Sequence, residues 1–219
     1  KGVSDKLRAI TDEYLISKGI DQKIPPLSIL DDEFLSDVAK RNRAKTKAAA
    51  IEHAVRSYIE EHLDEDPELF ASFAEMLEKI LQDSQHNWEL VYQELKKLLD
   101  RIREEENKPT FGLHRKKQMP FFRMFQSEIF DKEELTEDEI SVLVNLTQHL
   151  TNLLEQELSL AGFWESARLT AQNRLKGEIQ KLLLSREFCN LPNMIKKWQA
   201  LVSRIMEIAQ KNNDTILYA

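Results

Sequence analysis

Histidine is the side chain that most readily binds a metal ion or moves protons near neutral pH. The sequence has five: His53, His62, His86, His114 and His149. His53 and His62 fall nine residues apart on one expected helix, so they lie on opposite sides of it. The other three fall in separate segments, and there is no H-E-x-x-H pattern and only one cysteine, Cys189. We therefore expect surface or half-buried histidines rather than a metal centre.

The sequence also lacks the complete motifs of nucleotide binding and of nuclease catalysis. A phosphate-binding P-loop needs G-x-x-x-x-G-K-[S/T], and the five glycines are far apart and never precede Lys in that way. Glu94-Leu95-Lys96 matches the E-x-K half of a nuclease motif. Leu95, however, belongs to an apolar stripe with helical spacing, so the tripeptide is expected in the middle of a helix. We expect no catalytic residue, cofactor or metal ligand in this chain.

Two basic segments are candidates for contact with phosphates. The first is the acid-free stretch 40–47, which holds Lys40 and the candidate residues Arg41, Arg43, Lys45 and Lys47. The second is a loop that holds the candidate residues Arg115, Lys116 and Lys117. The net charge of −7 makes the chain a poor general DNA binder, because its mean field repels phosphate. A solvated surface therefore stays open as the other interpretation of both segments.

The elements that must position these residues are helices. Only 5 Gly and 6 Pro occur among 219 residues, and apolar residues recur every three or four positions. Asp66-Pro67 is a helix start, because Asp accepts from free N–H groups and Pro suits the first turn. Thr136 and Glu139 fit a capping box, and Pro120 opens a short, very apolar helix. The pattern predicts an all-α fold, an irregular multi-helix bundle of about eight helices.

The predicted helices group into two subdomains. Residues 1–30 are expected to form a linker and a leading helix, and residues 31–106 a first helical subdomain. Residues 107–119 form a connecting loop, and residues 120–219 form a second helical subdomain. The acidic run 60–66 is explained as the end of one helix and the start of the next. No apolar run reaches the roughly 18–20 residues of a membrane span, and a single cysteine fits a reducing compartment.

Four segments carry a resemblance to a known family. They are 15–21 (Leu-Ile-Ser-Lys-Gly-Ile-Asp), 48–56 (Ala-Ala-Ala-Ile-Glu-His-Ala-Val-Arg), 62–69 (His-Leu-Asp-Glu-Asp-Pro-Glu-Leu) and the ending from 173–179 (Asn-Arg-Leu-Lys-Gly-Glu-Ile) to 206–209 (Met-Glu-Ile-Ala). From about residue 10 onward the chain resembles the C-terminal helical domain of the restriction (motor) subunit of type I restriction–modification enzymes. The chain does not begin with Met, so we expect a piece of such a subunit.

The resemblance implies a role in assembly. The parent would be an ATP-dependent type I site-specific deoxyribonuclease of the bacterial or archaeal cytoplasm, with a nuclease domain and two motor domains that use ATP and Mg²⁺. The C-terminal domain would help to dock that subunit onto the methyltransferase and specificity subunits, with no catalytic residue of its own. Two alternatives stay open: a module that contacts duplex DNA through the basic segments, and a helical protein-interaction adaptor of an unrelated system.

Overall fold

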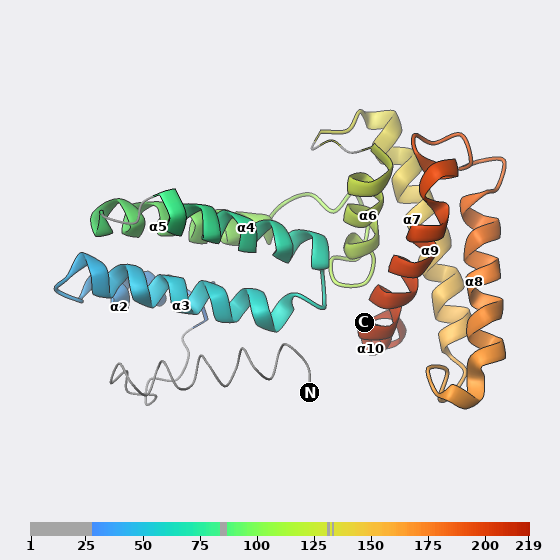
Figure 1. Cartoon of the computed structure of the whole chain (residues 1–219), viewed down its shortest axis with the longest axis horizontal. Coiled ribbons are helices and arrows are strands. Elements are labelled where there is room, and N and C mark those ends of the chain that lie inside the picture. The colour runs from blue at the N-terminus through green and yellow to red at the C-terminus, as the bar shows by residue number, and fades with distance from the viewer. Residues whose placement is uncertain (1–27, 84–86, 131, 133) are drawn as a thin grey trace. The chain divides into compact units, whose positions relative to one another are not determined.

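The computed structural model describes residues 28–83, 87–130, 132 and 134–219, and within these ranges it contains helices and no strand (Figure 1). The α-helices are α2 (Asp32–Ala39), α3 (Ala44–His62), α4 (Pro67–Asp83), α5 (Trp88–Glu105), α6 (Met119–Phe125), α7 (Glu137–Leu158), α8 (Leu169–Leu183), α9 (Met194–Lys211) and α10 (Asn213–Tyr218). A π-helical turn, η1 (Gln126–Phe130), continues α6, and a 3-10 turn, η2 (Ser166–Arg168), precedes α8. Eight of the described α-helices have seven or more residues, which confirms the predicted all-α multi-helix bundle.

The chain separates into two compact units, residues 1–42 and residues 43–219. The described part of the first unit is α2 with its flanking turns. The predicted linker and leading helix over residues 1–30 falls almost entirely outside the described residues. The predicted loop 107–119 lies inside the second unit, between α5 and α6, so the division into two helical subdomains at this loop stays a prediction.

The first three helices of the second unit contact one another along their apolar faces. On α3 the buried residues are spaced by three or four: Ala48, Ile51, Val55 and Ile59. This spacing places them on one face of the helix. The facing side of α5 buries a continuous stripe of six residues: Val91, Tyr92, Leu95, Leu98, Leu99 and Ile102. Because short connections join the three helices, α4 runs back along α3 and α5 runs back along α4 (Figure 1).

Helix α6 is the centre of the remaining bundle. Six of its seven residues are buried: Met119, Pro120, Phe121, Phe122, Met124 and Phe125. A helix that is apolar all round must be covered on every side, and α6 contacts α4, α7 and α9. The predicted short apolar helix at Pro120 is thereby confirmed, and it links the first three helices to the last ones.

Two predicted helix starts have the expected caps. Thr136 Oγ1 accepts from the N–H of Glu139 at 3.3 Å, and the Glu139 carboxylate accepts from the N–H of Thr136 at 2.8 Å. This reciprocal pair is the predicted capping box of α7. At the start of α4, the Asp66 carboxylate accepts from the N–H of Leu69 at 3.2 Å. Both helices therefore begin where the local sequence indicates.

Candidate functional site

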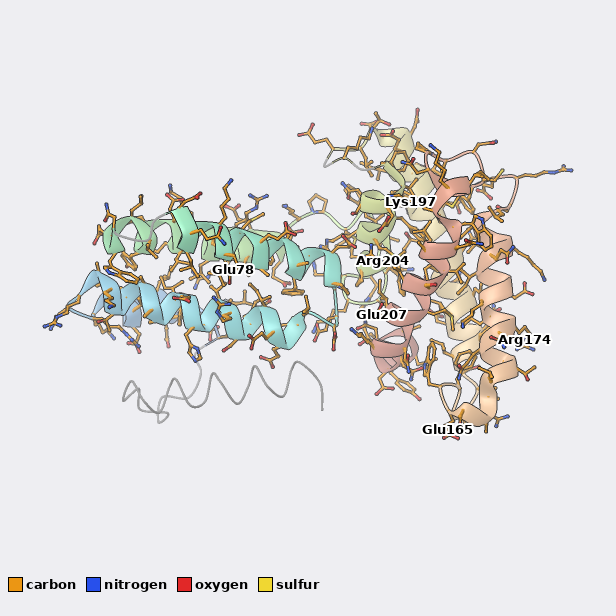
Figure 2. All side chains as sticks on the ribbon, viewed as in Figure 1. Glu78, Glu165, Arg174, Lys197, Arg204 and Glu207 are labelled. Atoms are coloured by element: carbon orange, nitrogen blue, oxygen red, sulfur yellow. The ribbon has the colours of Figure 1, made fainter. Side chains whose placement is uncertain are left out.

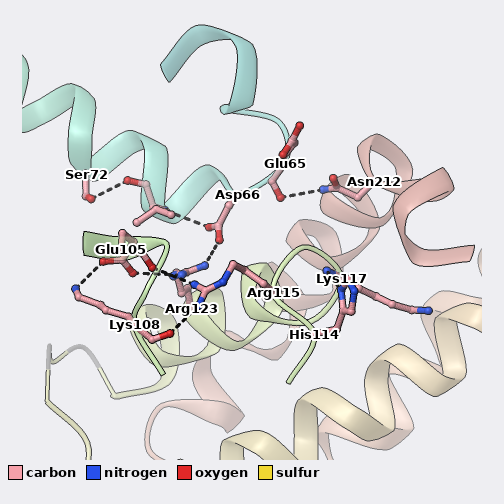
Figure 3. Close-up of polar contacts among 11 residues, drawn as sticks. Glu65, Asp66, Ser72, Glu105, Lys108, His114, Arg115, Lys117, Arg123 and Asn212 are labelled. Carbon is pink, nitrogen blue, oxygen red and sulfur yellow. Dashed lines mark hydrogen bonds and ion pairs between the residues drawn. The ribbon is translucent and has the colours of Figure 1, made fainter. Parts of the chain in front are cut away.

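The turn between α3 and α4 is the most heavily paired acidic segment of the described chain. Its acids bind cations from much later helices: Asp66 pairs with Arg123 of α6, Glu68 with Arg204 of α9, and Asp64 with Lys211 at 2.7 Å. The side-chain amide of Asn212 also donates to the carbonyl oxygen of Asp64 at 3.0 Å. It donates to that of Glu65 at 3.2 Å as well (Figure 3). We call residues 64–68 the acidic turn; it joins the first three helices to the C-terminal ones.

Arg123 is the central cation of this arrangement. Its guanidinium binds Asp66 on one side and the Glu105 carboxylate, at 3.2 Å, on the other (Figure 3). The side chains of Arg123 and Asp66 are only 14% and 7% exposed. Burial raises the pKa of Asp66, while Arg123 and the Leu69 N–H oppose that rise. A buried carboxylate in this position depends on its cation, because an unpaired charge in the interior is strongly unfavourable.

A second cluster joins α4 and η1 to α9. The Glu128 carboxylate pairs with Lys197 at 2.9 Å and with Arg204, which also holds Glu68. Lys197 and Arg204 project from the same side of α9 (Figure 2). The hydrogen bond from Lys197 lowers the pKa of Glu128 most, and Arg204 adds to the effect against a penalty from burial. Together the two clusters hold α4, α6, η1 and α9 to one another around the acidic turn, and we call this ion-paired region the fixed base.

A groove of about 660 Å³ opens beside this base, between α4, α5, α6 and the start of α7. We call it the α4–α6 groove. Apolar side chains line much of it: Leu69, Phe73, Met76, Pro109, Phe111, Met119, Phe122, Leu135 and Ile140. Charged side chains also line it: Glu68, Arg101, Glu105, Lys108, Arg123, Lys132 and Glu134. A smaller groove of about 470 Å³ along α4 and α5 shares Met76 and Arg101 with it.

Phe111 is the most exposed aromatic residue that lines the α4–α6 groove, with 45% of its surface accessible. Its ring lies 5.5 Å from that of Phe122, which is buried. The backbone at Phe111 has a φ of 54°, in the left-handed region that non-glycine residues rarely adopt. Phe111 thus combines an unfavourable backbone conformation with an exposed aromatic ring at the edge of an apolar groove.

The structure places the first basic segment at the beginning of α3. Arg43 and Lys45 are exposed and Lys47 is half-buried, and none of the three has an acidic partner among the described residues. Arg41 is exposed and belongs to the first unit, where Lys40 pairs with Asp37 at 2.7 Å. Phosphate contact by this segment stays a prediction.

The second basic segment is largely engaged within the chain. The Arg115 guanidinium donates to the carbonyl oxygens of Glu105 and Lys108, at 3.0 and 2.7 Å, and so fixes the loop after α5 (Figure 3). Lys117 pairs with Glu155 at 2.8 Å and is only 14% exposed. Lys116 is exposed and has no acidic partner among the described residues. Two of these three candidate DNA contacts therefore already have structural partners.

The remaining chemical candidates are dispersed. In the ranges that the structure describes, no three His, Cys, Asp or Glu side chains come together in a way that could hold a metal ion. Glu94 lies within α5 and pairs with Lys97 at 2.7 Å, one position beyond the lysine of the E-x-K match. Cys189 is half-buried and not part of a disulfide. His86 lies outside the described residues.

Among the helices that the structure describes, none is long and apolar enough to cross a bilayer. Sequence reasoning missed the role of Arg123, Arg204 and Glu128, whose partners lie 18 to 136 residues away along the chain. The one available signal was Arg123 itself, a single charge within the otherwise apolar sequence of α6. A charge in such a helix needs a buried partner.

Comparison with known proteins identifies the family. A family model described as type I restriction enzyme HindI endonuclease subunit-like, C-terminal, matches residues 10–212. No curated protein and no solved structure matches the chain. The matched range begins where the sequence resemblance begins and includes the acidic turn and the α4–α6 groove. The chain belongs to the family of C-terminal domains of type I restriction enzyme endonuclease subunits of the HindI-like kind.

Proposed function

We propose that this domain docks the ATP-dependent translocase and nuclease subunit of a type I restriction enzyme onto its methyltransferase–specificity complex, and that it catalyses no reaction itself. The observation that carries the proposal is the α4–α6 groove, an apolar surface that opens on a base fixed by ion pairs. Family membership excludes the third interpretation, an adaptor from an unrelated system. ATP and Mg²⁺ would be bound by other domains of the parent subunit, in the bacterial or archaeal cytoplasm.

The composition of the groove favours a protein as its occupant. Protein interfaces combine an apolar, aromatic-rich centre with a polar rim, and aromatic side chains contribute much of their binding energy. Phe111 supplies an exposed aromatic ring, while Glu105 and Arg123 are neutralised by pairing within the chain. Since these charges are already paired, an apolar segment of the methyltransferase or specificity subunit would not have to desolvate a free ion beside them.

The fixed base is suited to docking because it lowers the entropic cost of binding. Arg115 ties the loop after α5 to Glu105 and Lys108, and Phe111 follows within the same loop. The left-handed backbone at Phe111 is part of this fixed loop. The loop that carries the ring is therefore held by hydrogen bonds before a partner arrives.

Co-elution of the parent subunit with its purified methyltransferase–specificity complex, without DNA, tests the proposal. The variant Phe111→Asp removes the ring, and Asp tolerates a left-handed backbone better than most residues. Its matched control is Ile195→Asp on α9, where an apolar side chain that is 63% exposed lies away from the groove. We expect the Phe111 variant to bind the complex about tenfold more weakly, which corresponds to a loss of roughly 1.4 kcal/mol of binding free energy. The Ile195 variant is expected to co-elute as the wild type does.

Equal retention of both variants would remove the groove from the proposal. The isolated 219-residue chain is also expected to show neither ATPase activity nor Mg²⁺-dependent cleavage of duplex DNA. Robust cleavage by the purified chain would contradict the non-catalytic role. The alternative of a DNA-contacting module is supported by one specific surface, at the beginnings of α3 and α5.

A further inference from the structure

A row of lysine–aromatic contacts joins the beginnings of α3 and α5. Lys45 Nζ lies 5.1 Å from the centre of the Trp88 ring, and Lys47 Nζ lies 5.5 Å from that of Tyr92. Lys96 Nζ, one turn further along α5, lies 5.7 Å from the same Tyr92 ring. A cation at about 6 Å or less from an aromatic ring is attracted to its face, so the rings hold three ammonium groups in place. We call these five residues the lysine–aromatic surface.

The positive charge of this surface is not neutralised within the described chain. None of Lys45, Lys47 and Lys96 forms an ion pair with a described acid. Two of the acids near them in sequence pair with other cations: Glu52 with Arg56, and Glu94 with Lys97. In a chain of net charge −7, three adjacent lysines without an acidic partner form a local exception to the overall field.

We propose that the lysine–aromatic surface binds the phosphate backbone of duplex DNA. Lysine is depleted from the interfaces between proteins, whereas Lys and Arg are the side chains that neutralise DNA phosphates. The exposed Arg43, at the residue before α3, adds a fourth cation beside Lys45. These contacts read no base sequence, so the surface would hold any duplex near the docked subunit. The proposal is independent of the docking groove, which shares no residue with this surface.

This surface, rather than the basic loop, is the site of contact. In the loop, Arg115 and Lys117 would have to leave the carbonyl oxygens and the Glu155 carboxylate that they already bind. On the lysine–aromatic surface no such partner must be displaced. Trp88 is 38% exposed, so its ring is also accessible to a bound strand.

Fluorescence anisotropy of the 219-residue chain with a labelled random-sequence duplex, over a salt series from about 50 to 200 mM, tests the proposal. Each phosphate that a lysine neutralises adds roughly 0.9 to the slope of log K against log salt. Because this slope is negative, we expect the double variant Lys45→Ala, Lys47→Ala to reduce its magnitude by about 1.8. The charge-matched control is Lys176→Ala, Lys196→Ala, which removes two exposed lysines without ion pairs in the described chain from α8 and α9.

A second readout uses Trp88. Its emission is expected to change when the duplex binds, and this change is expected to be absent in Trp88→Phe, which keeps a ring beneath Lys45. Circular dichroism of each variant verifies that the helices are retained. An unchanged slope in the Lys45, Lys47 variant, or an equal loss in the control, overturns the proposal. Salt-dependent binding to a poly-glutamate peptide, with none to the duplex, would instead assign the surface to an acidic protein and also overturn it.

Discussion

The guanidinium of Arg123 on α6 is ion-paired with the carboxylate of Asp66, which precedes it by 57 residues in the turn before α4. Both side chains are largely buried, and the same guanidinium holds Glu105 at the end of α5. One cation therefore joins the start of α4 and the end of α5 to the central helix. This arrangement predicts a strong dependence of the fold on Arg123.

Replacement of Arg123 by Met is expected to lower the free energy of unfolding by about 3–5 kcal/mol, because it leaves the buried Asp66 carboxylate without a cation. Urea unfolding followed by circular dichroism measures the change. The control is Arg174→Met, which removes an Arg that is 63% exposed and pairs with Glu157. An exposed pair of that kind contributes about 0–1 kcal/mol. A cost for Arg123→Met no larger than that of the control would contradict the prediction.

Glu128 is expected to contribute stability that depends on pH. Lys197, and then Arg204, lower the pKa of Glu128 in the folded chain, while the unfolded value is about 4.3. The contribution is therefore present above about pH 4.3 and is lost as the pH falls through the lowered folded value. Glu128→Gln should be less stable than the wild type at pH 7, and the difference should shrink below about pH 4. Urea unfolding at both pH values measures it; a difference that stays constant would contradict the assignment.

Tyr58 is expected to cause a loss of stability in alkali. Burial, with added repulsion from Glu106, Glu65 and Glu61, raises the pKa of Tyr58 to about 12. The folded chain keeps a proton that the unfolded chain releases above about pH 10, so the free energy of unfolding falls as the pH rises from about 10 to 12.

The variant Tyr58→Phe should remove this loss. Urea unfolding at about pH 9 and pH 11 measures it, and absorbance of the tyrosinate ion follows the titration itself. Tyr218→Phe is the matched control, since Tyr218 is 81% exposed. If both variants show the same alkaline dependence as the wild type, the loss does not originate at Tyr58.

Features that depend on neighbours in sequence could be predicted. The capping box of Thr136 and Glu139 needs only a three-residue spacing, and the buried stripe of α3 needs only the helical repeat. In the same way Pro120 marked the short apolar helix, because every residue of that helix except Arg123 is apolar. Local spacing was sufficient for the fold class and for these two helix starts.

Features that depend on distant partners could not be predicted. The interpretation of the acidic run as a helix end followed by a helix start is correct for Asp66, which accepts from the Leu69 N–H, but it is incomplete. It omits Arg204 and Lys211, which bind Glu68 and Asp64 across 136 and 147 residues. Likewise, the sequence of the basic loop gives no sign that Arg115 already binds backbone carbonyl oxygens and that Lys117 already pairs with Glu155. Periodicity reports which face of a helix is buried, but it does not report what covers that face.

The acidic turn has a consequence for the order in which the chain is made. Its three cations all follow residue 119, and Lys211 is synthesised 147 residues after Asp64. At roughly 5–20 residues per second, about 7 to 30 seconds separate the two during translation. Asp66 gains Arg123 after 57 residues, whereas Glu68 and Asp64 gain Arg204 and Lys211 only after 136 and 147 residues. The first helices of the second unit thus reach their final charge balance only after Lys211 has been synthesised.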